Sequence, residues 1–162
     1  MFETQQELYE FQLNYIKLLA ADFDEADMAV APYPGGNPPV WILGHLAICT
    51  DFAAGLLGQK PECPREWHKH FAPGSNPAEV PQPHPTKAEL LTALEKGHRR
   101  VAAALPEASA EALAQPHSVA ILSRTNLKTN GHVLGHLMST HAAFHVAQLS
   151  ACRRVKGKPP VV

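Results

Sequence analysis

The chain has 162 residues, of which 45% are apolar and 18% charged, and its formal net charge is −1. This predicts one soluble globular domain over residues 1–162 with room for a hydrophobic core. The charge excludes the basic field typical of nucleic-acid binding, and no apolar run approaches membrane-spanning length. Three scattered cysteines without CxxC spacing, together with no signal-peptide pattern, predict reduced thiols and a cytoplasmic location.

Apolar residues at helical spacing predict a first helix over residues 4–23. Thr4 followed by Glu7 is a candidate capping box at its start. The helix is expected to stop where carboxylates crowd its end against the helix dipole, at Asp22, Asp24, Glu25 and Asp27.

A second helix is predicted over residues 40–57, after a loop rich in proline and glycine. Asn37 is a candidate N-cap, the prolines suit the first turn, and Gly58 is a stop signal. His45 lies at the centre of the apolar face, on a regular helical wheel. A lone histidine there is usually a satisfied core residue, but this one could also meet a histidine pair from another helix.

Residues 59–85 contain many prolines and show no sustained periodicity. They predict a long loop between the second and third helices, either as surface decoration, which we prefer, or as a lid partly ordered by short helices. The third helix begins at a capping box formed by Thr86 and Glu89 and ends at Pro106. His98 lies on its inward seam, where it could support metal ligands or contact a substrate, although we prefer a core role.

The last helix, over residues 129–154, carries two histidine pairs with the same spacing, His132/His136 and His141/His145. Residues four apart share one helix face, so each pair could aim two imidazoles at one point, which suits a metal ion. On a regular wheel the two pairs face opposite sides, with His141 and His145 pointing inward. A buried imidazole pair needs partners, either a metal or backbone groups and water.

The inner face is expected to carry the large apolar residues of this helix, Leu134, Leu137, Met138, Phe144, Leu149 and Cys152. The outer face is expected to carry mainly small residues, Ser139, Ala143, Ala147 and Ser150, with Arg154. That outer face predicts either solvent exposure or a helix–helix contact.

Four long amphipathic helices without a strand pattern predict an all-α fold, specifically a four-helix bundle. Bundles build metal sites from inward side chains on facing helices. One histidine of the second helix and the inward pair of the last would together supply three nitrogen ligands.

Two segments, residues 41–46 (WILGHL) and 141–148 (HAAFHVAQ) followed by Arg153, resemble motifs of the DinB-like family. This damage-inducible four-helix-bundle superfamily includes metal-dependent thiol transferases and proteins described as metal-dependent hydrolases. The order of elements is also similar, so the resemblance spans nearly the whole chain. It implies a homodimer and a divalent metal held by His45, His141 and His145.

Three neutral imidazoles leave the charge of the metal available to its open positions. Zinc in such a site lowers the pKa of bound water to about 7, which supports hydrolysis. It can equally hold a low-molecular-weight thiol as the nucleophilic thiolate, for transfer to an electrophile. Zinc and nickel are the expected metals, and iron and manganese are the alternatives.

No carboxylate base is evident on the inner seams, since Asp51 lies off the His45 face and Glu95 lies away from His98. Neither histidine pair has the glutamate of an HExxH protease. These absences favour the transferase hypothesis. A non-enzymatic metal-binding dimer and a haem-binding bundle are the remaining hypotheses, and Gln148 and Asn14 are the candidate partners of the ligands.

Overall fold

The computed structural model describes residues 2–161, and its regular elements are helical, without a β-strand among those residues. The α-helices are α1 (Glu3–Ala21), α2 (Pro39–Leu56), α3 (Arg65–Phe71), α4 (Lys87–Ala104), α5 (Ala110–Ala114), α6 (Asn130–His136) and α7 (Ala142–Val155). A π-helical turn, Leu137–His141, joins α6 to α7. Short 3-10 turns lie at Pro77–Glu79, Leu105–Glu107 and Ala120–Leu122. The all-α prediction is confirmed.

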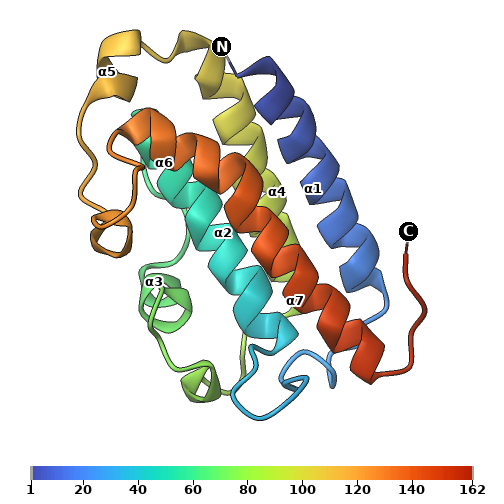
Figure 1. Ribbon diagram of the computed structural model, residues 1–162. Helices are drawn as coiled ribbons and strands as arrows, with labels where there is room; N and C mark the ends of the chain where they lie inside the picture. The colour runs from blue at the N-terminus through green and yellow to red at the C-terminus, as the bar shows by residue number, and fades with distance from the viewer. Residues whose placement is uncertain (1, 162) are drawn as a thin grey trace.

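The long helices α1, α2 and α4 and the α6–α7 run lie side by side, with α2 packed along α4 (Figure 1). α1 packs against α7, the π-helical turn and α4, while α2 also contacts α3 and α7. Apolar side chains of these elements fill the interior between them. Side chains that point inward from α2 and α7 therefore meet.

α2 is the most enclosed element of the chain. Of the 18 residues of its apolar window, 78% are buried. By length and composition it could cross a membrane, so the expectation that no apolar run approaches that length was too strict. The burial is that of a core helix, which makes α2 only weak evidence for a membrane span.

Local sequence signals explain several helix ends. The Thr86 side chain accepts from the backbone N–H of Glu89, and the Glu89 carboxylate accepts from that of Thr86, which confirms the capping box of α4. Thr129 caps α6 with its side chain. Gly58 and Gly157, which follow α2 and α7, have φ of 79° and 72°, the left-handed conformation that glycine adopts without strain.

Two predicted caps were wrong. α1 begins before Thr4, at an N-cap residue, Phe2, that offers no side-chain hydrogen bond. The N-cap of α2 is Pro38 rather than Asn37. The Asn37 side chain instead donates to Oε1 of Gln148, 3.3 Å away on α7, so a tertiary contact replaces the local cap.

Two of the carboxylates at the end of α1 have tertiary partners on or beside α7. Asp22, the C-cap residue, accepts from Nε of the buried Arg153 at 2.7 Å. Asp27 pairs with Lys156, just beyond α7. A buried guanidinium needs such a counter-charge, so these carboxylates tie the end of α1 to the end of α7.

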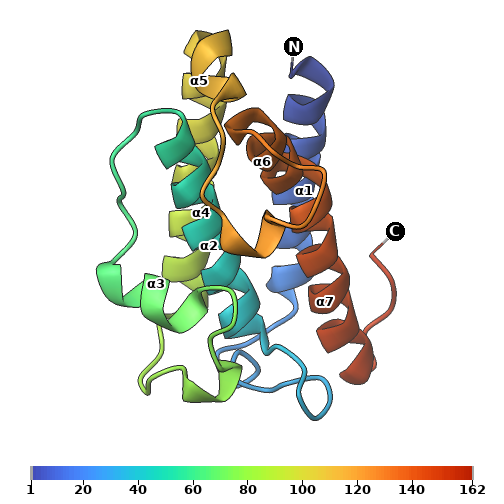
Figure 2. The same cartoon turned by 60° about the vertical axis from the view of Figure 1, so that its left-hand side comes forward.

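The link between α2 and α4 contains α3 and a 3-10 turn and lies against α2 (Figure 2). Near the start of the link, the backbone N–H groups of Glu62 and Cys63 donate to the buried carboxylate of Asp51 in α2, which also accepts from Arg100 of α4. Further along, the buried Phe71 ring packs on Gly44, where a Cβ would lie 2.6 Å from ring carbons. The link is therefore fixed to α2 at two separated points.

α2 and α4 approach closely where Gly97 faces Thr50, because a Cβ on Gly97 would lie 2.1 Å from Oγ1 of Thr50. Gly97→Ala is therefore expected to destabilise the fold by about 1–3 kcal/mol through overpacking. Gly55→Ala is the matched control, since its Cβ would meet nothing within 4 Å and the change should stabilise by about 0.5–1 kcal/mol. Chemical denaturation of both variants checks this, and equal stability would contradict the close approach.

Candidate metal centre

Three histidines from distant parts of the chain meet in the interior. His45 lies within α2, His141 ends the π-helical turn, and His145 lies in the first turn of α7. The Nε2 atoms of His45 and His141 are 3.1 Å apart, and one ring nitrogen from each histidine lies within 4.8 Å of the others. The structure thus brings together the three histidines that the sequence selected, and they could hold a metal ion.

The π-helical turn orients His141, and the sequence did not reveal it. Its i→i+5 geometry places residues five apart side by side, so the regular wheel fails across it. His136, predicted to face away, has its ring centroid 5.6 Å from that of His141. Phe144, predicted to point inward, is 68% exposed, whereas the other large residues assigned inward are buried or half-buried. Such turns often occur at functional sites.

The link after α2 holds His45. Nδ1 of His45 lies 2.6 Å from the carbonyl oxygen of Phe71, and because a carbonyl only accepts, Nδ1 carries the hydrogen and Nε2 keeps a free lone pair. The imidazole stacks on Trp41 with ring centroids 4.7 Å apart, and Nε1 of Trp41 donates to Oγ of Ser75. The link therefore supports the site, which the preferred interpretation as surface decoration missed.

Gln148 holds His145 in the same way. Its Oε1 lies 3.0 Å from Nδ1 of His145 and also accepts from Asn37, which identifies that atom as the amide oxygen. Nδ1 of His145 therefore carries the hydrogen, and its Nε2 is free. The expected contact between Gln148 and His145 is therefore present, whereas the side chain of Asn14 is exposed and bonds only to Glu10 in the described chain.

Cys49 adds a sulfur atom to the histidine cluster. Its Sγ lies 3.6 Å from Nε2 of His45 and 3.9 Å from Nε2 of His141. On sequence grounds Cys49 is only one of three scattered, reduced cysteines, without an assigned role. The i, i+4 spacing from His45 to Cys49, the same spacing that drew attention to the histidine pairs, could have revealed it.

Burial keeps the three imidazoles neutral. Loss of water lowers the pKa of His45 below its usual range and that of His145 to about 4. It lowers the pKa of His141 to about 3, with a further contribution from the neighbouring imidazoles. Together with the Nδ1 partners of His45 and His145, this leaves neutral rings whose free nitrogens converge. That donor set fits a divalent cation.

Metal-free protein is expected to lose stability as the pH falls below about 6.5. In the unfolded chain these histidines take up protons near that pH, whereas in the folded chain His145 and His141 do so only at about 4 and about 3. The unfolded state therefore binds more protons across this window, and the stability is fully present above it. Thermal melts over this pH range should show the decline, and His141→Gln should make it shallower; identical pH profiles would contradict the assignment.

His132 and His136 lie outside the cluster. His132 is exposed, and its Nδ1 accepts from the backbone N–H of Lys128. His136 is half-buried and shares a hydrogen bond with Oγ1 of Thr140. Both line an open surface hollow of about 650 Å³. Because His136 packs edge-on against the ring of His141, this hollow adjoins the histidine cluster.

His98 is also outside the cluster. It is buried in α4, its ring stacks on Tyr9 with centroids 3.8 Å apart, and its Nδ1 lies 3.8 Å from a carboxylate oxygen of Glu10. This packing agrees with the preferred core role. Its Nε2 has no hydrogen-bond partner among the described residues.

The cluster contains no carboxylate among the residues that the structure describes. Asp51 is occupied by Arg100 and the backbone of the link, and Glu95 pairs with Lys17 at 2.7 Å. The expectation that neither acid serves the histidines is consistent with these contacts.

The family to which the chain belongs follows from its sequence. The sequence model of the DinB superfamily matches residues 8–149. A solved structure described as a conserved protein from Enterococcus faecalis is similar, with a TM-score of 0.71, 19% identity and 98% of each chain covered, which shows the fold alone. No curated protein matches the chain. Because the superfamily match covers most of its length, the chain belongs to the DinB superfamily.

Proposed function

We propose that this chain is a divalent-metal protein in which His45, His141 and His145 hold the ion. The observation that carries the proposal is the convergence of three ring nitrogens within 4.8 Å. The Phe71 carbonyl and the Gln148 amide support it, because they fix the ring tautomers as partners of metal ligands commonly do. Zinc or nickel suits three imidazoles, with iron or manganese as alternatives.

We further propose that the protein transfers a low-molecular-weight thiol to an electrophile. A divalent metal in this position would lower the pKa of a coordinated thiol and so favour the nucleophilic thiolate. The protein itself would keep the imidazoles neutral and orient their free nitrogens toward the metal. The lack of a carboxylate in the described cluster favours this reaction over metal-dependent hydrolysis, which needs a base to accept a proton.

The surface hollow beside α6 is our candidate position for the electrophile. Its lining includes His136, whose ring packs against that of His141, and Thr140, which directly precedes His141 in the chain. Both side chains can donate hydrogen bonds and could orient a polar substrate.

The alternative is a non-enzymatic metal-binding dimer. Cys49 favours it, because a sulfur beside the histidines could fill a position that a catalytic site keeps open. On α7, the exposed Phe144 lies near exposed Ala143 and Ala147, and a second copy could cover this apolar surface. The molar mass in solution tests the dimer.

The remaining proposals concern the whole chain. We propose that residues 1–162 form a single cytoplasmic DinB-like domain, in which α1, α2, α4 and the α6–α7 run constitute a four-helix bundle. The net charge of −1 supports the absence of a nucleic-acid partner, and the burial of α2 supports the absence of a membrane partner.

Thiol transfer is tested with the metal-loaded protein, a panel of small thiols such as glutathione and cysteine, and chlorodinitrobenzene as the electrophile. Conjugation above the uncatalysed rate is expected, and His45→Ala should reduce it to background because one ligand is lost. His84→Ala, in the link between α2 and α4, is the control, because His84 belongs neither to the histidine cluster nor to the lining of this hollow. Conjugation that persists in His45→Ala would contradict the proposal, and metal binding without turnover would favour the non-enzymatic alternative.

A further inference from the structure

Cys49 differs from the other two cysteines in what its sulfur contacts. The Sγ atoms of Cys63 and Cys152 each lie near a backbone carbonyl oxygen, at 3.7 Å and 3.6 Å. Among the described residues, the polar contacts of Cys49 Sγ are the Nε2 atoms of His45 and His141. The thiol of Cys49 therefore points into the proposed metal centre.

The distances from Cys49 Sγ to two of the three histidines agree with four-coordinate geometry, while the group whose ligand atoms all lie within 4.8 Å of one another contains the three histidines without Cys49. A tetrahedral zinc with bonds of about 2.0–2.1 Å to nitrogen and about 2.3 Å to sulfur places sulfur roughly 3.5 Å from each nitrogen and the nitrogens roughly 3.4 Å apart. The sulfur of Cys49 is 3.6 Å and 3.9 Å from the two nitrogens, which are themselves 3.1 Å apart. The ring centroid of His145 lies 4.7 Å from that of His45 and 4.7 Å from that of His141, on the same cluster.

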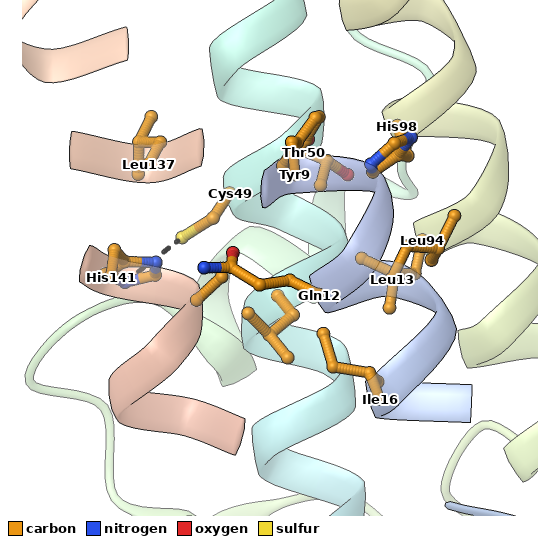
Figure 3. Close-up of a pocket in the computed structure, with 12 residues that line it drawn as sticks. Tyr9, Gln12, Leu13, Ile16, Cys49, Thr50, Leu94, His98, Leu137 and His141 are labelled. Atoms are coloured by element: carbon orange, nitrogen blue, oxygen red, sulfur yellow. Dashed lines mark hydrogen bonds between the residues drawn. The ribbon is translucent and has the colours of Figure 1, made fainter. Parts of the chain in front are cut away.

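The sulfur also borders a small, mainly apolar cavity into which a few polar groups project. Cys49 and His141 line an enclosed cavity of about 20 Å³ together with Tyr9, Gln12 and His98 (Figure 3). Oη of Tyr9, Oε1 of Gln12 and Nε2 of His98 are buried without hydrogen-bond partners in the described chain. A cavity of this size has room for about one water molecule, which such groups would bind. A charged sulfur at this wall would therefore adjoin polar groups as well as apolar ones.

From these contacts we infer that Cys49 is a fourth ligand of the metal, so that the centre has three imidazole nitrogens and one thiolate sulfur. The thiol releases its proton to solvent when the metal binds. The sulfur would favour zinc or cobalt over manganese or magnesium. The inference rests on the proposed metal site, and it adds that a substrate thiol must either enter as a fifth ligand or displace Cys49.

The competing interpretation is a neutral thiol that donates a weak hydrogen bond to an imidazole. X-ray absorption of the zinc-loaded protein separates the two, because a zinc–sulfur distance of about 2.3 Å is resolved from zinc–nitrogen distances of about 2.0–2.1 Å. Cobalt(II) loading gives a second readout, since a sulfur-to-cobalt charge-transfer band in the near ultraviolet requires a bound thiolate.

The inference predicts one sulfur neighbour and a charge-transfer band in the wild type and in Cys63→Ala. Both signals should disappear in Cys49→Ala, while the three histidines still retain zinc at millimolar concentrations of the free ion. Bound metal without a sulfur neighbour in the wild type overturns the role of Cys49 and leaves the histidine site intact. A sulfur signal that survives in Cys49→Ala also overturns it. Failure of the wild type to bind any metal overturns the histidine site as well.

Discussion

Replacement of His141 by alanine is expected to weaken zinc binding by about a hundredfold or more, because one of three protein nitrogens is removed from a buried site. The Nε2 atom of His141 lies 3.1 Å from the Nε2 atom of His45, so it belongs to the closest pair of nitrogens in the proposed site. Isothermal titration of the metal-free protein with zinc measures the loss. Circular dichroism on the same sample establishes that the variant is folded.

His132→Ala is the matched control for this experiment. His132 belongs to the other histidine pair of the same helical run, but its side chain is exposed and its Nδ1 serves the backbone of Lys128. Its replacement should leave zinc affinity within about twofold of the wild type, in line with the small effects of surface substitutions. Equal losses in both variants would mean that zinc binds through exposed histidines rather than at the buried cluster.

Gly44→Ala is expected to damage both the fold and the metal site. The new Cβ would lie 2.6 Å from ring carbons of Phe71, so α3 must move away from α2, at a cost of about 1–3 kcal/mol. That movement also withdraws the Phe71 carbonyl from Nδ1 of His45, a contact of 2.6 Å. Loss of such a ligand partner typically weakens metal binding by about 10–100-fold.

A second substitution tests the cause. Phe71→Leu shortens the side chain that the new methyl group meets but keeps the backbone carbonyl, so it should restore part of the zinc affinity lost in Gly44→Ala. Gly55→Ala lies in the same helix with open space around its Cβ. It should not lower the melting temperature and should leave the zinc affinity unchanged. Gly44→Ala protein that melts and binds zinc like the wild type would show that α3 does not support His45.

The sequence predicted the helices and ligands that depend on local rules. The capping box at Thr86 places the start of α4 correctly, and apolar periodicity finds α1 and α2 to within two residues of their observed ends. The i, i+4 spacing and the inward faces select His45, His141 and His145 before their proximity is known. Gln148 follows from the same wheel, because the chain between it and His145 is regular helix.

The failures have tertiary causes. The π-helical turn has no local signature in the sequence, so the wheel carried an error across it and placed His136 on the face opposite His141. The carbonyl of Phe71 reaches His45 only because the link folds back on α2 at Gly44, a path that periodicity does not encode. Asn37 does not cap α2, because its side chain donates to Gln148 on α7 instead. Each case is an override of local preference by packing.

Elemental analysis of the purified protein tests the central claim most directly. About one divalent metal ion per chain, retained through dialysis and removed by a chelator, is the result that a buried three-histidine centre predicts. Protein that is metal-free when isolated should take up one equivalent of added zinc or nickel. A folded chain that holds no metal under either condition would contradict the centre, and the convergence of His45, His141 and His145 would then be a packing arrangement only.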